Sequence, residues 1–410
     1  MSDFPVLAQP REAVPPVVAS PEALRLTCQA LQNGHGPVAI DTERAHGFRY
    51  IPRAYLIQLR REGSGTHLID PLALGEKDGL RPLADTLAGT QWILHAATQD
   101  MPCLAMDGLR PDDLFDTELA GRLLNLPRVG LGPMVEHYCK VTLLKEHSAS
   151  DWSRRPLPRD WLIYAALDVE LLNDVREKII ADLHDTGKDE WARQEFAHLV
   201  DMAAELPSEP PGVDPSRWRT IHHIGDIRSR AGLQLAHDLW LARENVAHDL
   251  DRAPGKILRD EAIVAAAQYC DRTVNVSAKR ILSIKGFHRG QAKKHRQTWV
   301  DAINHARGVS PKKYPPLRKH SAAIPHPRSW ERHHPQQAAR WAVLRPAVNQ
   351  VATDYDVPPE ILCSPAWLRQ FAWQPPRDLS TAGVDTFLAD CGARPWQREI
   401  LASLLSEVML

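Results

Sequence analysis

Short apolar runs separated by polar residues predict an α/β fold for the first half of the chain. Four runs are rich in β-branched side chains and bounded by Gly, Pro or charge, which is typical of strands: 38–40, 55–59, 67–69 and 92–94. Helical spacing accompanies them and is clearest from Trp161 to Val175. The later parts of the chain show helical spacing only, as in the stretch from Leu233 to Val246. We therefore expect a mixed sheet flanked by helices, followed by two small all-α domains.

Proline-rich segments divide the chain, because proline ends helices and favours extended linkers. The N-terminal segment also has too little apolar content to bury, so we expect it to be disordered. The predicted organisation is a Pro-rich tail over 1–21, an α/β domain over 22–205, a linker over 206–215, a helical domain over 216–306, a basic Pro-rich linker over 307–328 and a C-terminal helical domain over 329–410.

Composition argues against several classes of protein. No apolar run approaches the roughly 18 residues that a membrane span requires, so no membrane association is expected. The first twenty residues lack the basic start and apolar core of a secretory signal, which leads us to expect a cytoplasmic protein. The six cysteines never form a Cys-x-x-Cys pair, so no local zinc or redox motif is present.

The net charge of −1 conceals one strongly basic stretch, 279–319, with twelve Lys and Arg against the single acid Asp301. The stretch carries +11, so the rest of the chain carries −12. A solvated basic face that keeps an acidic protein soluble is one explanation. The density of the cations favours binding to nucleic acid instead.

Two carboxylates follow the apolar strand that ends at Ile40. Residues two apart in a strand face the same side, so Asp41 and Glu43 project together. Two adjacent anions repel each other, and a cation between them relieves the repulsion. Their ligand atoms are hard oxygens, which favours Mg²⁺ or Mn²⁺.

The same Asp-Thr-Glu triplet recurs at Asp116, which shows that the triplet alone is weak support for a metal site. There an apolar helical run follows, so Asp116 is interpreted as a helix N-cap, with Glu118 favoured in the first turn.

Further acidic residues distinguish the first triplet from the second. Asp100 follows the strand 92–94 after a short connection. Tyr164 and Asp168 lie four residues apart and therefore on one helix face. Because that helix is largely core-facing, a carboxylate at 168 would be costly to bury without a partner, and a metal ion would be such a partner.

Six sequence blocks follow one another in the first part of the chain: VAIDTE at 38–43, LIQL at 56–59, LIDP at 68–71, HAATQD at 95–100, SDWSRRPL at 150–157 and YAALDV at 164–169. They resemble, in the same order, the successive blocks of the ribonuclease D family, the tyrosine subclass of the DEDD exonucleases. The resemblance implies a ribonuclease H-like fold and a two-metal 3′ to 5′ exonuclease.

The resemblance also implies roles for individual residues. Asp41, Glu43, Asp100 and Asp168 would hold two divalent ions, Mg²⁺ or Mn²⁺, and Tyr164 would orient the attacking water. A phenol with a pKa of about 10 is a poor base at neutral pH, so orientation is the role we assign to it. The candidates for contact with the substrate in this domain are Thr42, Gln58, His95, Trp152 and Arg155. His95 is more simply a structural histidine, and Trp152 is equally a core anchor.

Residues 216–306 resemble the helicase-and-ribonuclease-D C-terminal (HRDC) domain in the blocks LWLARE at 239–244, PGKILRDE at 254–261 and ILSIKGF at 281–287. Lys285, Lys293 and Lys294 are the candidates for phosphate contact there. Residues 329–410 are expected to form a second, less similar HRDC-like domain that completes a channel for a single strand.

The leading hypothesis is an exoribonuclease that releases 5′-mononucleotides from single-stranded RNA 3′ ends. The resemblance implies tRNA precursors as substrates, and a monomer is expected. The alternatives are a DNA exonuclease with the same catalytic group, and a non-catalytic RNA-binding protein.

Overall fold

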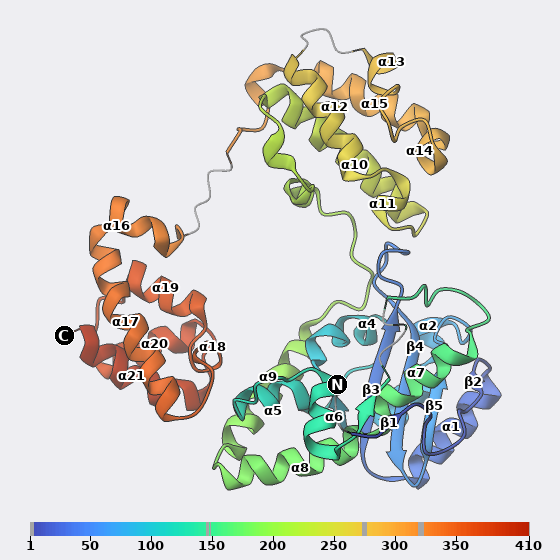
Figure 1. Cartoon of the computed structure of the whole chain (residues 1–410), viewed down its shortest axis with the longest axis vertical. Coiled ribbons are helices and arrows are strands. Elements are labelled where there is room, and N and C mark those ends of the chain that lie inside the picture. Colours follow the sequence, from blue (N-terminus) through green and yellow to red (C-terminus); the bar gives the residue numbers. More distant parts are fainter. Residues whose placement is uncertain (1–3, 145–146, 148, 273–276, 319–323, 410) are drawn as a thin grey trace.

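The computed structural model describes residues 4–144, 147, 149–272, 277–318 and 324–409 (Figure 1). Within these ranges the chain forms an α/β body followed by helices without strands, which confirms the expected change from mixed to helical structure. Lys319, one of the twelve cations of the basic stretch, lies outside the described residues.

A six-stranded mixed sheet forms the centre of the α/β body, in the order β2-β5-β4-β3-β6-β7. Strand β4 pairs antiparallel with both β3 and β5, whereas β6 pairs parallel with β3 and β7. The strands are β2 (Val17–Val18), β3 (His35–Arg44), β4 (Ala54–Glu62), β5 (Gly65–Ile69), β6 (Gln91–Leu94) and β7 (Asp113–Asp116). A separate parallel pair joins β1 (Val6–Leu7) to β8 (Thr142–Leu143).

Helices cover both faces of the sheet, because side chains along β3 alternate between two cores. Val38 and Ile40 face a core that includes residues of α1, α3 and α4, whereas Ala39 faces residues of α5, α6 and α8. Helix α7 lies across β3, β4 and β5. The helices of this body are α1 (Pro21–Asn33), α2 (Glu76–Gly79), α3 (Arg81–Leu87), η1 (Ala97–Gln99), α4 (Met101–Met106), α5 (Thr117–Leu123), α6 (Leu131–Cys139), α7 (Arg159–Glu170), α8 (Leu172–Asp185) and α9 (Asp189–Glu205).

The four predicted strands are confirmed as β3 to β6, but the N-terminal segment differs from its expected disorder. Val6–Leu7 pairs with β8, and Val17–Val18 adds a strand to the edge of the main sheet, which buries Val18. Each apolar pair is too short to fold alone and is ordered because a distant strand offers its free edge. The helical stretch expected from Trp161 is interrupted at Leu171, where α7 ends and α8 begins.

The helices after residue 214 gather in two groups (Figure 1). The first has its own core, which includes Leu239, Ile263 and Trp299. Its elements are η2 (Pro215–Thr220), η3 (Ile224–Asp226), α10 (Arg230–Asp249), α11 (Pro254–Ile257), α12 (Asp260–Arg272), α13 (Ala278–Ile281), α14 (Gly290–Lys294), α15 (Arg296–Gly308) and η4 (Pro311–Lys313). None of the described helices combines the length and hydropathy of a membrane span.

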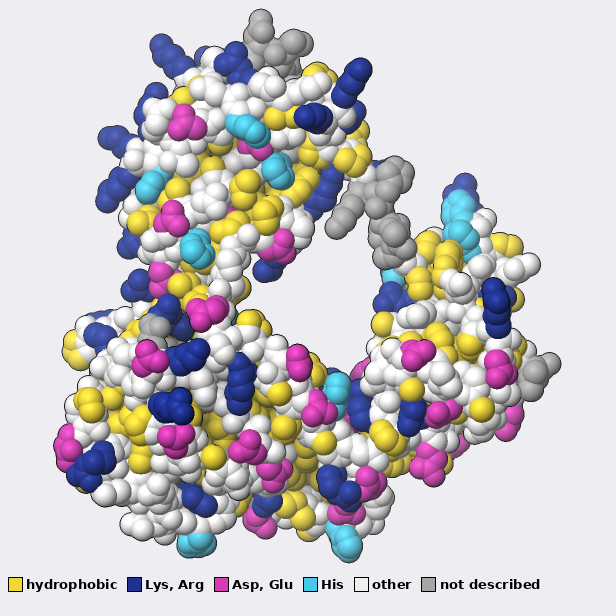
Figure 2. All heavy atoms as spheres, turned by 180° about the vertical axis from the view of Figure 1, so that it is seen from behind, with side chains coloured by type: hydrophobic (Ala, Val, Ile, Leu, Met, Phe, Trp, Pro, Cys, Tyr) yellow, Lys and Arg dark blue, Asp and Glu magenta, His cyan; other side chains and the backbone are white. Residues whose placement is uncertain are grey.

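The second helical group shares one continuous core with the α/β body. On α9, Trp191 stacks on Trp396 with ring centroids 4.4 Å apart. Glu195, also on α9, accepts hydrogen bonds from Arg394 Nε (2.8 Å) and Trp396 Nε1 (2.9 Å). The elements of this group are η5 (Pro327–Ser329), α16 (Trp330–His333), α17 (Pro335–Asp354), α18 (Pro359–Leu362), α19 (Pro365–Trp373), α20 (Thr381–Asp390) and α21 (Pro395–Met409). The three bodies surround a central opening (Figure 2).

Glu195→Ala should lower the free energy of unfolding by about 3 kcal/mol, because it leaves the half-buried guanidinium of Arg394 and the buried indole N–H of Trp396 without their acceptor. Chemical denaturation followed by tryptophan fluorescence measures the effect. Glu205→Ala at the end of the same helix is the control, since the exposed Glu205 side chain makes no hydrogen bond or salt bridge with another described residue, and it should cause no resolvable change. Equal unfolding midpoints for the two variants would contradict this account of the interface.

Candidate metal centre and active site

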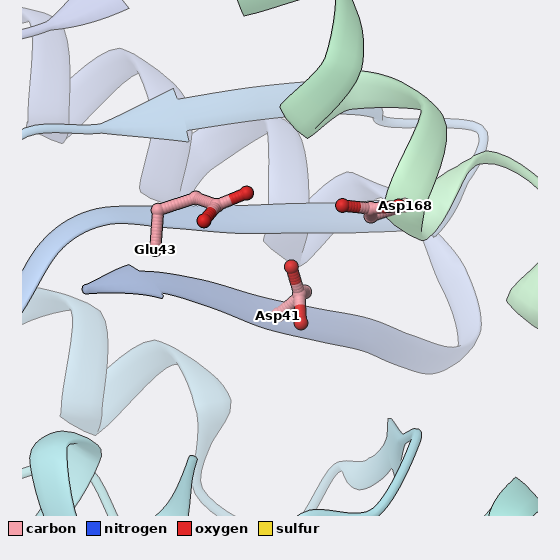
Figure 3. A group of neighbouring side chains, drawn as sticks. All are labelled: Asp41, Glu43 and Asp168. Carbon is pink, nitrogen blue, oxygen red and sulfur yellow. The ribbon is translucent and has the colours of Figure 1, made fainter. Parts of the chain in front are cut away.

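Three carboxylates converge where β3 passes beneath α7. Asp41 and Glu43 project from the same side of β3, and Asp168 reaches them from α7 (Figure 3). Each contributes one oxygen to a group whose members all lie within 4.8 Å of one another. The two strand residues and the helix residue therefore form one cluster.

Burial makes this cluster electrostatically costly. Burial raises the pKa of Asp41 well above its ordinary value, and repulsion from Asp100 and Asp168 raises it further. Burial and repulsion from Asp41 raise the pKa of Glu43 to about 11. Arg44 opposes both shifts, but it does not cancel them. The carboxylates can therefore be ionised together at neutral pH only when a cation compensates their charge.

The donor set fits a hard divalent cation. All three groups offer carboxylate oxygens, the ligands that Mg²⁺ and Mn²⁺ prefer. Gln58 lies directly opposite Asp41 in the β3–β4 register and is fully buried. Neither side-chain atom of Gln58 finds a hydrogen-bond partner among the described residues, although buried amides are normally paired. An ion with its water ligands would supply the polar neighbour that this amide lacks.

Asp100 lies beside the cluster and not within its three-carboxylate group. It accepts a 2.6 Å hydrogen bond from the Thr42 hydroxyl, and Thr42 faces the side of β3 opposite to Asp41. Arg44 pairs with Asp100 at 3.5 Å and donates to the carbonyl of Gln99. Asp100 is close enough to raise the pKa of Asp41, so it remains a predicted ligand for a second ion.

Tyr164 lies one helical turn before Asp168, as the spacing predicts. Burial raises the pKa of its phenol far above 10, and the charges of Asp168 and Glu43 add to that shift together with a hydrogen bond to Asp168. The phenol therefore keeps its proton at any physiological pH. A proton donor at this position can orient a water molecule but cannot remove its proton.

Three of the residues predicted to contact the substrate pack against or hydrogen-bond to other residues of the chain. Trp152 is fully buried and packs on Trp161, with centroids 5.1 Å apart, and on Tyr164, at 6.3 Å, which favours the core-anchor alternative. His95 Nδ1 lies 2.9 Å from the Thr117 hydroxyl, an arrangement typical of a satisfied structural histidine. Arg155 donates to Asp70, to the Tyr55 carbonyl and to two carbonyls of its own loop.

Asp116, in the second triplet, is confirmed as the N-cap of α5. Its carboxylate accepts from the backbone N–H groups of Glu118 (2.8 Å) and Leu119 (3.1 Å). It also accepts from Ala96 (3.0 Å) and Ala97 (2.8 Å), where Ala96 adopts a left-handed conformation (φ 60°). Asp116 therefore fixes the turn that leads to Asp100, a role that the sequence analysis missed.

Arg44 is the other residue that the sequence analysis missed, although alternation along β3 places it with Thr42 on one face.

The three lysines predicted to contact phosphate, Lys285, Lys293 and Lys294, are all exposed. Lys294 borders a cavity that also includes Arg49 of the α/β body. The structure thus brings one of these lysines to the junction between the bodies.

Two family models match the chain in separate regions. A model described as 3′-5′ exonuclease covers residues 16–184, which include the whole carboxylate cluster. A model described as 3′ to 5′ exonuclease C-terminal domain covers residues 323–409.

Curated relatives are about 30% identical to the chain over the aligned residues. Ribonuclease D of Zymomonas mobilis is 30% identical over 73% of this chain and 75% of its own length. Ribonuclease D of a Jannaschia species is 30% identical over 62% of this chain, and ribonuclease D of Sphingobium indicum is 31% identical over 58%. The chain spans 65% and 60% of the lengths of these last two proteins.

Solved structures share the fold. The crystal structure of a protein from Bifidobacterium adolescentis has a TM-score of 0.87 and 34% identity, covering 99% of both chains. The structure of Escherichia coli RNase D has a TM-score of 0.65 and 23% identity over 96% of this chain and 98% of its own. The ribonuclease H-like exonuclease fold implied by the sequence is thereby confirmed.

Glu43→Gln should raise the free energy of unfolding of the metal-free protein. This increase over the wild type should become larger as pH rises. The folded carboxyl keeps its proton from its ordinary pKa of 4.5 up to about 11, so the unfolded state binds fewer protons in that window and wild-type stability falls as pH rises. We expect the gain to increase by about 1 kcal/mol or more between about pH 5 and about pH 8, measured by denaturation in EDTA. Glu118→Gln in the second triplet is the control, and a gain for Glu43→Gln that does not change with pH would contradict the electrostatic account.

Proposed function

The chain belongs to the ribonuclease D family, and from this premise we propose that it is a 3′ to 5′ exoribonuclease releasing 5′-mononucleotides from RNA 3′ ends. The observation that carries the proposal is the convergence of Asp41, Glu43 and Asp168 in one partly buried group. Tyr164 on the same helix face as Asp168, and Asp100 beside the group, complete the set of side chains that the family pattern requires.

Different side chains would have different roles in hydrolysis. Divalent cations, when bound, supply Lewis-acid stabilisation of the charge that develops on the phosphate and on the leaving 3′ oxygen. Asp41, Glu43 and Asp168 would hold one ion, and Asp100, with Asp41, would hold the second. Asp41 and Glu43 tie ion binding to proton release, because their raised pKa values keep them protonated without a cation. We propose Mg²⁺ or Mn²⁺ as the physiological ion.

Tyr164 positions the attacking water in this proposal. Its phenol keeps its proton, which forms the hydrogen bond with Asp168 in the metal-free chain; once Asp168 holds an ion, the same proton would turn to the water and fix the direction from which it approaches the phosphorus. The buried Trp152 ring, 6.3 Å away, supports Tyr164 from the core side. The loop that carries Trp152 is itself held by Arg155, through Asp70 and the Tyr55 carbonyl.

The helices after residue 214 are proposed to guide the substrate. The resemblance of residues 216–306 to the HRDC domain and the cations of the basic stretch support contact with single-stranded RNA. The C-terminal helices, which pack on α9 and border the central opening, would act as a clamp on that strand (Figure 2). We further propose that the enzyme works as a monomer and that tRNA precursors are among its substrates.

Asp41→Asn should abolish turnover while single-stranded RNA is still bound, because the variant loses a metal ligand but none of the basic surface. Digestion of matched 3′-labelled and 5′-labelled RNA and DNA strands with Mg²⁺ or Mn²⁺ measures polarity and sugar preference together. Asp113→Asn, at an exposed strand end, is the control and should keep full activity. Preferred digestion of DNA would favour the DNA exonuclease alternative, and binding of RNA without any digestion by the wild type would favour the non-catalytic one.

Tyr164→Phe should lower kcat about tenfold to a hundredfold and leave KM nearly unchanged, since the phenol acts on the water and not on substrate binding. Steady-state kinetics on a 5′-labelled RNA measure both constants. Tyr138→Phe is the matched control, because Tyr138 also donates to a carboxylate, Asp182 (2.8 Å), away from the cluster. A rise in KM with an unchanged kcat would show that Tyr164 contacts the substrate instead.

A further inference from the structure

The junction between the α/β body and the first helical group forms an open basic cavity of about 540 Å³. The cavity, called here the seam pocket, is lined from one side by Phe48, Arg49 and Asp151. The other side is lined by Arg252, Lys256, Gly290, Gln291 and Lys294. Segments about 200 residues apart in the sequence therefore form a single site.

Specific contacts fix the seam pocket in place. Asp251 accepts hydrogen bonds from the backbone N–H groups of Tyr50 (3.1 Å) and Ile51 (2.9 Å). The N–H of Ala253 donates to the carbonyl of Phe48 (3.0 Å), and Lys256 lies 5.2 Å from the centre of the Phe48 ring. These contacts come from residues on both sides of Arg252, so the backbone that carries this arginine is held against the α/β body.

The charges in the seam pocket select an anion. Four cations, Arg49, Arg252, Lys256 and Lys294, face one carboxylate, Asp151, which gives an excess of +3. Asp151 is already occupied, because it accepts from the Ser153 hydroxyl (2.5 Å), and Ser153 in turn accepts from Arg49 Nε (2.9 Å). None of the four cations forms a salt bridge with another described residue, so their charge is available to a ligand.

One small apolar core supports both the seam pocket and the active site. Phe48 and Tyr164 both pack against the small core that contains Trp152, Ala165 and Ala166. Ser153, which holds Arg49, directly follows Trp152 in the chain. The seam pocket and Tyr164 therefore rest on the same small core.

We propose that the seam pocket binds a backbone phosphate of the RNA strand, upstream of the phosphodiester that is cleaved. Planar guanidinium groups such as those of Arg49 and Arg252 match the geometry of phosphate oxygens, and Lys256 and Lys294 add point charges. The contact carries no base information, so it would hold strands of any sequence in register with the carboxylate cluster. This inference rests on the proposed function and adds a substrate site to it.

Arg252→Ala is the sharpest test, because the Arg252 side chain is exposed and makes no described contact that holds the two bodies together. Binding of a single-stranded RNA should weaken about threefold to tenfold, and the slope of log affinity against log salt should fall by about 0.7. Binding is measured in the Asp41→Asn background, where no digestion occurs. In the active enzyme, KM for long strands should rise while cleavage of a dinucleotide, too short to reach the seam pocket, is unchanged.

Arg228→Ala is the matched control. Arg228 is exposed in the same helical group but precedes α10, whereas Arg252 follows it, so about 30 Å of helix separates the two arginines. RNA strands that each carry a single methylphosphonate, which removes one phosphate charge, locate the contact. At one or two positions this change should weaken binding to the Arg228→Ala protein but not to the double variant Arg252→Ala, Lys256→Gln. Identical profiles in the two proteins would overturn the phosphate site. A wild type that digests neither long RNA nor a dinucleotide would instead refute the proposed function, whatever the binding profile shows.

Discussion

Mutual repulsion among the clustered carboxylates of Asp41, Glu43 and Asp168 is the constraint around which the α/β body is arranged. Burial and proximity raise the pKa values of Asp41 and Glu43, so the folded chain holds these groups either protonated or neutralised by a cation. A fold selected only for stability would place apolar side chains here. Such a costly cluster is typical of a functional site, where charge is concentrated to bind ions and stabilise a reacting phosphate.

The surrounding residues keep this unfavourable cluster in place. Thr42 and Arg44 hold Asp100 from the opposite face of β3, and Asp116 fixes the turn before it through two backbone N–H groups. On the other side, Arg155 anchors the loop whose tryptophan packs on Tyr164. Each support is a polar contact between segments distant in sequence. The site therefore depends on the completed sheet and cannot form from β3 and α7 alone.

The two helical groups are attached in different ways, and the difference suits different roles. The C-terminal helices share a core with the α/β body and bury Glu195 at the interface, as in a permanent contact. The first helical group keeps its own core, on which Tyr50 of the α/β body packs, and otherwise meets that body through Asp251 and a few backbone contacts. A small polar junction leaves cations facing solvent next to the catalytic body, which a strand of nucleic acid requires and an apolar interface would exclude.

The sequence by itself determined the features that depend on local periodicity. Alternation along a strand placed Asp41 with Glu43, helical spacing placed Tyr164 with Asp168, and N-cap chemistry identified Asp116. Tertiary structure alone decided which segments meet: β2 at the sheet edge, Arg44 on Asp100, Asp116 on Ala96, and Arg252 opposite Arg49. The physical reason is that local spacing fixes the direction of a side chain, whereas its partner comes from a segment brought near only when the cores form.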